Sequence, residues 1–228
     1  MKSRGIPLFS LHGTHSVSTA EHALALLFAV ARRIPWAHAR MTGSDWRRWE
    51  FIGTEISGKT LGIFGIGRIG TEVAKRARAL GLRVLAYDPY VSGVEAARRG
   101  ARKTTWRKFI AQCDFLSLHS PLTLETKHAF GKKEFGAMKP SAIFINTARG
   151  EIVEEKALVN ALKNGRIRAA ALDVYPEEPL PKNHALRRYA RAHSNLILTP
   201  HIGASTREAA ENASMFCADA LVKFFGKR

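Results

Sequence analysis

The segment Lys59-Thr60-Leu61-Gly62-Ile63-Phe64-Gly65-Ile66-Gly67-Arg68-Ile69-Gly70 predicts a buried strand, a glycine turn and the start of a helix. Its glycines fit the pattern G-x-G-x-x-G: the first permits a tight turn, the second lets a pyrophosphate approach the backbone, and the third lets the helix pack closely on the strand. The helix that follows offers free N–H groups and the positive end of its dipole to that phosphate. Such a triplet also occurs in ordinary turns, so the prediction of a dinucleotide site depends on the surrounding sequence.

The residues on either side of the glycines complete the pattern of a βαβ unit. Residues 60–64 form an apolar run without alternation, as in a strand buried on both faces, and residues 71–80 place apolar side chains at helical spacing. A second apolar run, 83–87, ends in Asp88, close to the roughly 20-residue offset from the first glycine that is typical of a ribose-binding acid. A carboxylate there accepts hydrogen bonds from ribose hydroxyls and repels a 2′-phosphate, so NAD is favoured over NADP. The alternative is that Asp88 is a turn residue before Pro89.

Length and composition are those of a globular protein, since 228 residues with 46% hydrophobic content suffice for one large or two small domains. The chain has no run of about 18 uncharged apolar residues, so no membrane span is expected. The first residues lack the long apolar region and cleavage site of a signal peptide. Two cysteines, Cys113 and Cys217, do not make a disulfide framework, and a reduced cytoplasmic setting is expected. Cys113 is interpreted as a packing residue.

The chain is strongly basic, because 36 Lys and Arg residues against 19 Asp and Glu residues give a net charge of +17. Such a surface attracts nucleic acid, anionic membranes or anionic metabolites. No recognised nucleic-acid motif or long basic tail accompanies the charge, and we interpret it as a solvated basic surface. The basic residues are dispersed along the chain, in pairs such as Arg32-Arg33, Arg47-Arg48, Arg98-Arg99 and Arg187-Arg188.

The rest of the chain alternates predicted strands and helices, which indicates a doubly wound α/β fold, a parallel sheet with helices on both faces. The first 17 residues are predicted to be loop-like. A cap at Ser18 or Thr19 starts an apolar helix that runs to about Arg33 and is ended by Pro35, after which a helical segment can restart. Having so little polar surface, this helix is expected to be buried in the core or against a partner chain. Ser205 is predicted to cap a long closing helix, and later strands are expected at 115–118, 141–146, 169–173 and 195–198.

Ligands of such sheets bind beyond the carboxyl ends of the strands. Several polar side chains are predicted at these positions, and they should line one edge of the sheet. This convergence is the strongest indication that the chain carries chemistry. The residues are Asp88, Ser120, Arg149, Asp173, Glu178 and His201.

Three of these residues have the chemistry needed to exchange a hydride between a nicotinamide and a hydroxy acid. His201 can move a proton on the substrate oxygen, since imidazole titrates near neutrality, at about 6.5. A carboxylate such as Glu178 beside the ring would favour the imidazolium and fix its orientation. The planar guanidinium of Arg149 can bind a carboxylate bidentately and stays charged.

Each of these residues, taken singly, also has a plain structural interpretation. His201 could bond to backbone in a loop, Arg149 could cap or steer a helix, and Glu178 could be a solvated acid in a turn. Asp173 is predicted either to support this edge or to meet the nicotinamide side of the cofactor. No set of metal ligands accompanies His119, so no metal site is predicted.

Five motifs occur in order along the chain: Gly53-Thr54-Glu55 with Gly58-Lys59-Thr60-Leu61-Gly62, Gly65-Ile66-Gly67-Arg68-Ile69-Gly70, Asn146-Thr147-Ala148-Arg149-Gly150, Asp173-Val174-Tyr175-Pro176-Glu177-Glu178-Pro179, and Pro200-His201-Ile202-Gly203-Ala204-Ser205-Thr206. In these motifs the sequence resembles the D-isomer-specific 2-hydroxyacid dehydrogenases, most of all the members that act on 3-phosphoglycerate. The resemblance covers nearly the whole chain.

The resemblance implies an NAD-dependent oxidoreductase with the Rossmann fold, in which Arg149, Glu178 and His201 form the catalytic set. It implies a small 2-hydroxy or 2-keto acid as substrate, and a 3-phosphoglycerate-like acid suits the basic surface. It also implies a homodimer that involves the long early helix and the Trp-bearing segment after it. The implied cofactor contacts are Gly65, Gly67, Arg68, Ile69, Gly70, Asp88, Ser120, Pro121, Thr147, Ala148, Arg149, Asp173, His201, Gly203 and Ala204.

The sequence departs from the family at its beginning. Members start with a substrate-binding lobe of about one hundred residues, whereas this chain starts near the crossover out of that lobe. We therefore predict a remnant of the crossover at 1–17, an NAD-binding domain at 18–203, and at 204–228 a helix that in the family packs on the lobe. Because hydride transfer needs closure that excludes water, the chain alone is expected to catalyse poorly. The alternatives are an NAD(H)-responsive dimeric binding module of corepressor type and a nucleic-acid-binding protein.

Overall fold

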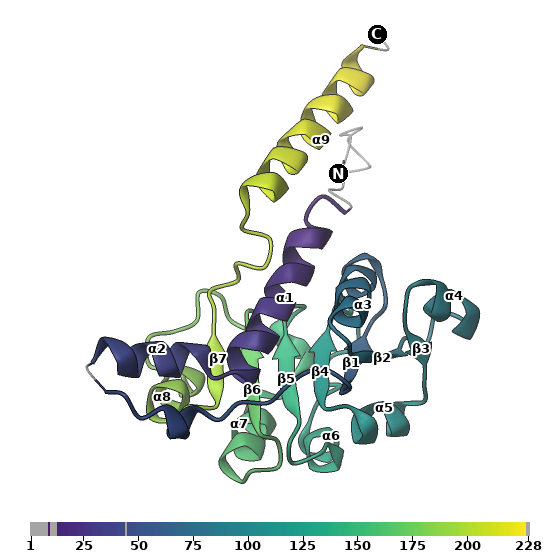
Figure 1. Cartoon of the computed structure of the whole chain (residues 1–228). Coiled ribbons are helices and arrows are strands. Elements are labelled where there is room, and N and C mark those ends of the chain that lie inside the picture. The colour runs from purple at the N-terminus through teal and green to yellow at the C-terminus, as the bar shows by residue number, and fades with distance from the viewer. Residues whose placement is uncertain (1–8, 10–12, 44, 227–228) are drawn as a thin grey trace.

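The computed structural model describes residue 9, residues 13–43 and residues 45–226. Within these residues, seven strands form one parallel sheet in the order β3-β2-β1-β4-β5-β6-β7 (Figure 1). The chain leaves β1 in one direction and returns to its other side at β4, and ligands bind at such a switch point in doubly wound sheets. The predicted doubly wound α/β fold is confirmed. The strands are β1 (Thr60–Phe64), β2 (Arg83–Tyr87), β3 (Arg102–Lys103), β4 (Phe115–Leu118), β5 (Ile143–Asn146), β6 (Ala169–Leu172) and β7 (Leu196–Leu198).

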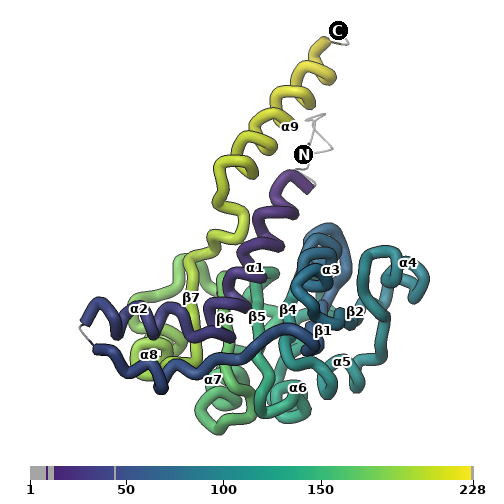
Figure 2. The backbone as a smooth tube through the Cα atoms, in the orientation of Figure 1, coloured from purple at the N-terminus to yellow at the C-terminus, as the bar shows by residue number. Residues whose placement is uncertain are grey.

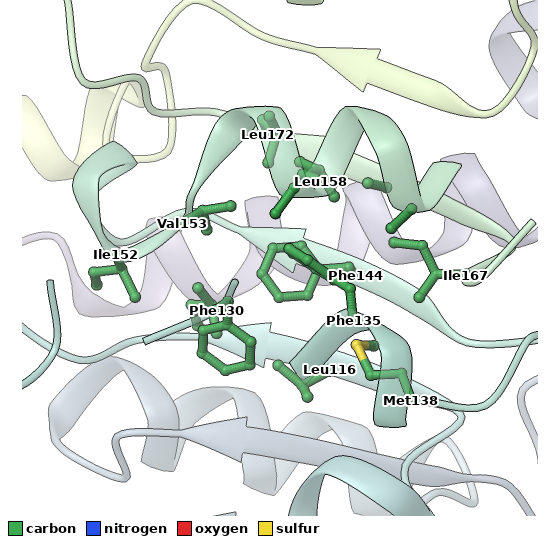
Figure 3. Packing of buried hydrophobic residues seen from close by; sticks show 14 of the residues in the cluster. Leu116, Phe130, Phe135, Met138, Phe144, Ile152, Val153, Leu158, Ile167 and Leu172 are labelled. Carbon is green, nitrogen blue, oxygen red and sulfur yellow. The ribbon is translucent and has the colours of Figure 1, made fainter. Parts of the chain in front are cut away.

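Helices cover both faces of the sheet and form a separate apolar cluster on each. One cluster joins the sheet to α1 (Ser16–Ala31) and α3 (Arg68–Ala79). Neighbouring residues of β5 enter opposite clusters, because Ile143 packs in this one and Phe144 in the other. Both faces of the strand are therefore apolar, which explains the unalternating sequence. Figure 3 shows the second cluster, which joins the sheet to α5 (Trp106–Gln112), α6 (Lys132–Ala137), α7 (Glu155–Lys163) and α8 (Ala185–Ala192).

The first helices differ from the prediction in their boundaries. α1 begins at Ser16, so the last part of the predicted loop is helical, while residues 1–8 and 10–12 of that loop lie outside the described residues. The prediction that Pro35 ends the first helix is wrong. The break lies at Arg33, whose φ of 57° is left-handed, and Pro35 lies in the first turn of α2 (Ile34–Thr42). A proline fits there because the first N–H groups of a helix have no partner in the helix.

The last helix, α9 (Arg207–Phe225), projects away from the sheet (Figures 1 and 2). Ala209 is its one buried residue within the described chain, whereas Met215, Val222 and Phe225 are more than half exposed, at 63%, 70% and 58%. The predicted cap at Ser205 is wrong by one residue. The Thr206 hydroxyl is the cap, since it accepts the Ala209 N–H at 3.1 Å.

Three short elements were not predicted: the two-residue edge strand β3 and the 3-10 turns η2 (Arg48–Phe51) and η3 (Gly150–Ile152). The helix α4 (Gly93–Arg98) lies between β2 and β3. Cys113 is fully buried against Gly62, as a packing residue should be, and burial raises the pKa of its thiol to about 12. No helix in the described part of the chain is long and apolar enough to cross a membrane.

Candidate functional site

The glycine turn, Gly65–Gly70, connects β1 to α3 and depends on the absence of side chains. Gly65 has a φ of +87°, and a Cβ there would lie 2.8 Å from the backbone of Ser120. A Cβ at Gly70 would lie 2.3 Å from the carbonyl oxygen of Gly65. At Gly67 an added Cβ would meet nothing within 4 Å, so the backbone there faces open space. The three glycines thus fit the roles of tight turn, phosphate approach and close helix packing.

The N-terminus of α3 supplies hydrogen-bond donors to that open space. Within the described residues, the N–H groups of Gly67, Arg68 and Ile69 have no acceptor. Free N–H groups at a helix N-terminus, together with the positive end of the helix dipole, bind anions such as phosphate. The predicted diphosphate contacts therefore lie where the backbone can make them.

Asp88 lies at the carboxyl end of β2, beside the glycine turn. Its Oδ2 accepts the Ile66 N–H at 3.1 Å, and its Oδ1 accepts the Tyr90 N–H at 3.0 Å. The two carboxylate oxygens together have about four acceptor sites, so capacity for ribose hydroxyls remains. Asp88 is thus a turn residue, as in the alternative interpretation of the sequence, and it is also an available hydrogen-bond acceptor.

A cavity of about 480 Å³ opens beside these residues, large enough for part of a dinucleotide. Its inner wall is aromatic, and the ring centroids of Tyr87 and Trp106 lie 4.9 Å apart. Tyr90 at the mouth donates its hydroxyl to Glu125 Oε2 at 2.5 Å. These wall residues were not predicted, because aromatic side chains at strand and helix positions have the pattern of an ordinary core. The predicted contacts that line the cavity are Gly65, Gly67, Asp88, Ser120 and Pro121.

His119 also lines this cavity, and its ring is neutral at physiological pH. Burial lowers the pKa of His119 to about 3. Its Nε2 lies 2.9 Å from Ser117 Oγ, and its buried Nδ1 has no partner among the described residues. A neutral imidazole with one free nitrogen is a hydrogen-bonding group that a bound ligand can satisfy.

The turn after β5 carries Arg149 and is held by its own side chains. Asn146 donates from Nδ2 to the Arg149 carbonyl at 2.9 Å and accepts the Ala148 N–H at 3.0 Å. The buried Thr147 hydroxyl has no partner within the described chain. Gly150 is required because a Cβ there would lie 2.1 Å from the backbone of Tyr175. The exposed Arg149 guanidinium donates one hydrogen bond to the Ala148 carbonyl at 2.6 Å.

Asp173 organises the acid–base loops, residues 173–179 and 199–203, which follow β6 and β7. It is 1% exposed and accepts hydrogen bonds from the Thr199 hydroxyl at 2.6 Å and from the N–H groups of Ile202 and Gly203 at 3.0 and 2.8 Å. His22 of α1 reaches the same carboxylate, with Nε2 3.3 Å from Oδ1. Burial opposes ionisation, but these donors together lower the pKa of Asp173 to about 2. These contacts fit the supporting role predicted for Asp173, and a contact with the nicotinamide side of the cofactor stays a prediction.

The structure brings His201 and Glu178 together. Glu178 Oε2 lies 2.6 Å from His201 Nδ1, and Glu178 Oε1 accepts the Tyr175 N–H at 2.9 Å. Partial burial opposes ionisation of Glu178, but these two donors lower the pKa of its carboxyl group. No partner for His201 Nε2 occurs in the part of the chain that the structure describes. His201 is also 49% exposed, so this nitrogen is available to a substrate.

Tyr175 was not predicted as a site residue, yet it fixes both acid–base loops. Its hydroxyl donates to the carbonyls of Leu172 and Thr199, at 3.1 and 2.8 Å, and its N–H orients Glu178. Burial raises the pKa of Tyr175, so it stays a neutral donor. Among the described residues, no hydrogen bond or ion pair joins Arg149 to the His201–Glu178 pair. No cluster of three or more metal-ligating side chains occurs in those residues either.

Comparison with known proteins identifies the class of protein that this geometry defines. Residues 24–203 match the family model of the D-isomer specific 2-hydroxyacid dehydrogenase, NAD binding domain, and the chain belongs to this family. The cofactor predicted from the glycine turn and Asp88, NAD, is thereby confirmed. The residues of the site fit this cofactor, since the turn has open backbone, free N–H groups and an adjacent carboxylate.

Individual relatives agree with the family. The chain is 45% identical over 219 residues to D-3-phosphoglycerate dehydrogenase of Archaeoglobus fulgidus. This match covers 96% of this chain and 41% of that protein. The TT0316 protein of Thermus thermophilus has a TM-score of 0.88 at 36% identity, over 99% of this chain and 70% of that one. D-Lactate dehydrogenase of Aquifex aeolicus, complexed with NAD and lactic acid, has a TM-score of 0.87 at 28% identity, over 99% and 71%.

The chain spans about two fifths of the length of the curated relatives it matches. Curated relatives at 45% and 43% sequence identity are D-3-phosphoglycerate dehydrogenases, which confirms the resemblance to members that act on 3-phosphoglycerate. These comparisons do not support the corepressor-type or nucleic-acid-binding alternatives.

Proposed function

We propose that this chain is the cofactor-binding part of an NAD-dependent D-2-hydroxyacid dehydrogenase whose substrate is a small hydroxy acid resembling 3-phosphoglycerate. The observation that carries the proposal is the 2.6 Å contact between His201 and Glu178, on loops at the same edge of the sheet as the glycine turn. The 45% identity to a D-3-phosphoglycerate dehydrogenase and the net charge of +17 favour an anionic substrate of this kind.

The glycine turn and its neighbours hold the cofactor. The N–H groups of Gly67, Arg68 and Ile69 bind the diphosphate, and the Asp88 carboxylate binds the adenosine ribose. The Thr147 hydroxyl, buried and without a partner in the described chain, is a further donor for the cofactor. Bound at this turn, NAD would supply the acceptor for the hydride that leaves the substrate carbon.

His201 moves the proton that accompanies this oxidation. Nε2 takes the proton of the substrate hydroxyl as the carbon loses its hydride, and it returns the proton when the reaction runs in reverse. Glu178 accepts the Nδ1–H, which fixes the tautomer and stabilises the imidazolium that forms. Glu178 can do this because its lowered pKa keeps it ionised.

Arg149 holds the substrate carboxylate. One guanidinium nitrogen is committed to the Ala148 carbonyl, and the rest of the group is exposed beside the end of β5. A guanidinium in this position binds a carboxylate through two parallel hydrogen bonds and orients the reacting carbon.

We further infer that the chain works as a cytoplasmic homodimer with a substrate lobe and that it catalyses poorly without the lobe. The exposed apolar side chains of α9 support a contact with the lobe, since clustered exposed apolar groups mark interaction sites. The exposed indoles of Trp46 and Trp49 support a dimer contact in the segment after α2.

Two measurements test the proposed function. The chain should bind NADH, followed by nucleotide fluorescence, and Asp88→Ala should weaken that binding. The chain should then be joined to the substrate lobe of the Archaeoglobus fulgidus relative and assayed with 3-phosphoglycerate. His201→Ala should lower kcat by about 10²–10⁴-fold. His38→Ala, at an exposed histidine of α2, is the matched control. Equal turnover by His201→Ala and the parent would reject the acid–base assignment.

A further inference from the structure

The carbonyl of Ile66, inside the glycine turn, accepts a hydrogen bond from a charged side chain of a different segment. Arg99 directly follows α4, and its Nη1 lies 2.6 Å from the Ile66 oxygen. Ile66 is fully buried, while the Arg99 side chain is 32% exposed. A charge-assisted hydrogen bond of this kind is roughly twice as strong as a neutral one.

The N–H group of Ile66 is held as well, by a group of opposite charge. It donates to Asp88 Oδ2 at 3.1 Å. Arg99 is itself braced, because its Nε donates to Glu95 Oε1 at 2.8 Å. The Glu95 N–H in turn donates to the Ser92 hydroxyl at the start of α4, at 3.1 Å. Ile66 of the turn is therefore fixed between the Asp88 carboxylate, just after β2, and the Arg99 guanidinium, just after α4.

The geometry of the peptide bond connects this contact to the phosphate site. The Ile66 carbonyl and the Gly67 N–H belong to one planar trans peptide, in which the two groups point in opposite directions. Fixing the carbonyl on Arg99 therefore directs the Gly67 N–H away from Arg99, at a residue where an added Cβ would meet nothing within 4 Å. A bond to the carbonyl also polarises the peptide and makes its N–H a stronger donor.

We propose that Arg99 is a positioning residue for the cofactor: by holding the Ile66 carbonyl it orients the Gly67 N–H toward the diphosphate. The inference rests on the proposed binding of NAD at the glycine turn and adds a residue outside the glycine motif. Arg99 need not touch the cofactor, because it acts through the peptide that does.

The neighbouring Arg98 provides a matched control. It has the same charge, is the last residue of α4 and also approaches Glu95, with 3.8 Å between Nη1 and Oε2. Its side chain is 76% exposed and has no contact with Ile66. A variant at Arg98 therefore removes the same charge from α4 and leaves the peptide of the turn in place.

The test compares three ligands on the full chain by titration calorimetry and displacement of NADH fluorescence: NADH, ADP-ribose and adenosine. Adenosine lacks the diphosphate and reports on the rest of the pocket. R99M should weaken NADH and ADP-ribose about tenfold, as for loss of a charged hydrogen bond, and leave adenosine unchanged. R98M should leave all three ligands unchanged. R99K keeps the charge but lacks the planar fork that reaches both Glu95 and Ile66, so it should lose most of the same affinity.

Each other result overturns the inference. Unchanged NADH affinity in R99M would show that the turn orients itself. An equal loss for adenosine would show that Arg99 merely supports the fold. Full NADH affinity in R99K would show that Arg99 contributes only its positive charge. If R99M does not fold, the affinity of R99K tests the inference in its place. A wild-type chain that binds neither NADH nor ADP-ribose would overturn the proposed function itself, and this inference with it.

Discussion

At the carboxyl edge of the sheet, the glycine turn is built from backbone, whereas the acid–base loops are built from side chains that bond across the chain. The turn needs three glycines within six residues, and its donors are N–H groups of the same segment. The acid–base loops depend on Asp173, which gathers donors from Thr199, from the loop after it and from His22 of α1. A backbone site should be sensitive to added atoms, and a side-chain site to removed ones.

Replacing Asp173 by alanine is the strongest test of this contrast. It removes the acceptor of four donors at a position that is 1% exposed. We expect the free energy of unfolding to fall by about 3–5 kcal/mol, because the donors are left buried without a partner. Urea unfolding followed by circular dichroism measures the change. Asp219→Ala, on the exposed side of α9, is the control and should change stability little. A loss below about 1 kcal/mol would show that the acid–base loops are stable without the Asp173 carboxylate.

His22→Ala removes one of those donors and tests whether α1 supports the acid–base loops. His22 Nε2 lies 3.3 Å from both Asp173 Oδ1 and Thr199 Oγ1. A hydrogen bond to a charged group contributes about 1.5–3 kcal/mol, so a loss of this size is expected in urea unfolding. His38→Ala on α2 is exposed and should be neutral. Equal stability of the two variants would show that His22 of α1 does not stabilise the acid–base loops.

The pH dependence of stability tests the same carboxylate in its ionised form. The pKa of Asp173 is about 2 in the folded protein against an ordinary value of 3.8. Since the folded value is the lower one, ionised Asp173 stabilises the protein fully above pH 4, and this contribution is lost as the pH falls toward 2. The difference in unfolding free energy between the parent and Asp173→Asn should therefore shrink by about 2 kcal/mol between pH 5 and pH 2. A pH-independent difference would mean that Asp173 has the same pKa in the folded and in the unfolded protein.

The contrast also explains which parts could be predicted from the sequence. The bounds of β1 and β2 agree with the prediction to the residue, because strand, glycines and acid are adjacent in the sequence and each has a local signal. The break at Arg33 and the cap at Thr206 were misplaced, because Pro35 and Ser205 carry the same local signals one or two residues away. The edge strand β3 was missed, since two basic residues have no strand pattern.

The candidate site follows the same rule. The predicted residues after the strands lie at the carboxyl edge of the sheet, because the carboxyl ends of all parallel strands meet there, independent of the side chains. The bond between His22 and Asp173 had no signal, because 151 positions separate two residues that are each common in loops and helices. Likewise nothing in the pair Arg98-Arg99 tells which arginine reaches Ile66. Local sequence patterns predict where a residue lies in the fold. Tertiary packing decides which partner its side chain contacts.

A pair of glycine variants tests the backbone side of the contrast, with the smallest expected effect. Gly67 has ordinary backbone angles and open space around an added Cβ, so Gly67→Ala should fold normally. The new methyl group occupies the space that the diphosphate needs, and NADH affinity should fall about tenfold, or 1.4 kcal/mol. Gly58 also has open space but a φ of +71°, so Gly58→Ala should lose about 1–2 kcal/mol of stability and bind NADH normally. Calorimetric titration and urea unfolding of both variants measure the two effects side by side. If Gly67→Ala bound NADH as well as the parent, the cofactor would not rest on this backbone, and the distinction between the two kinds of site would fail at the glycine turn.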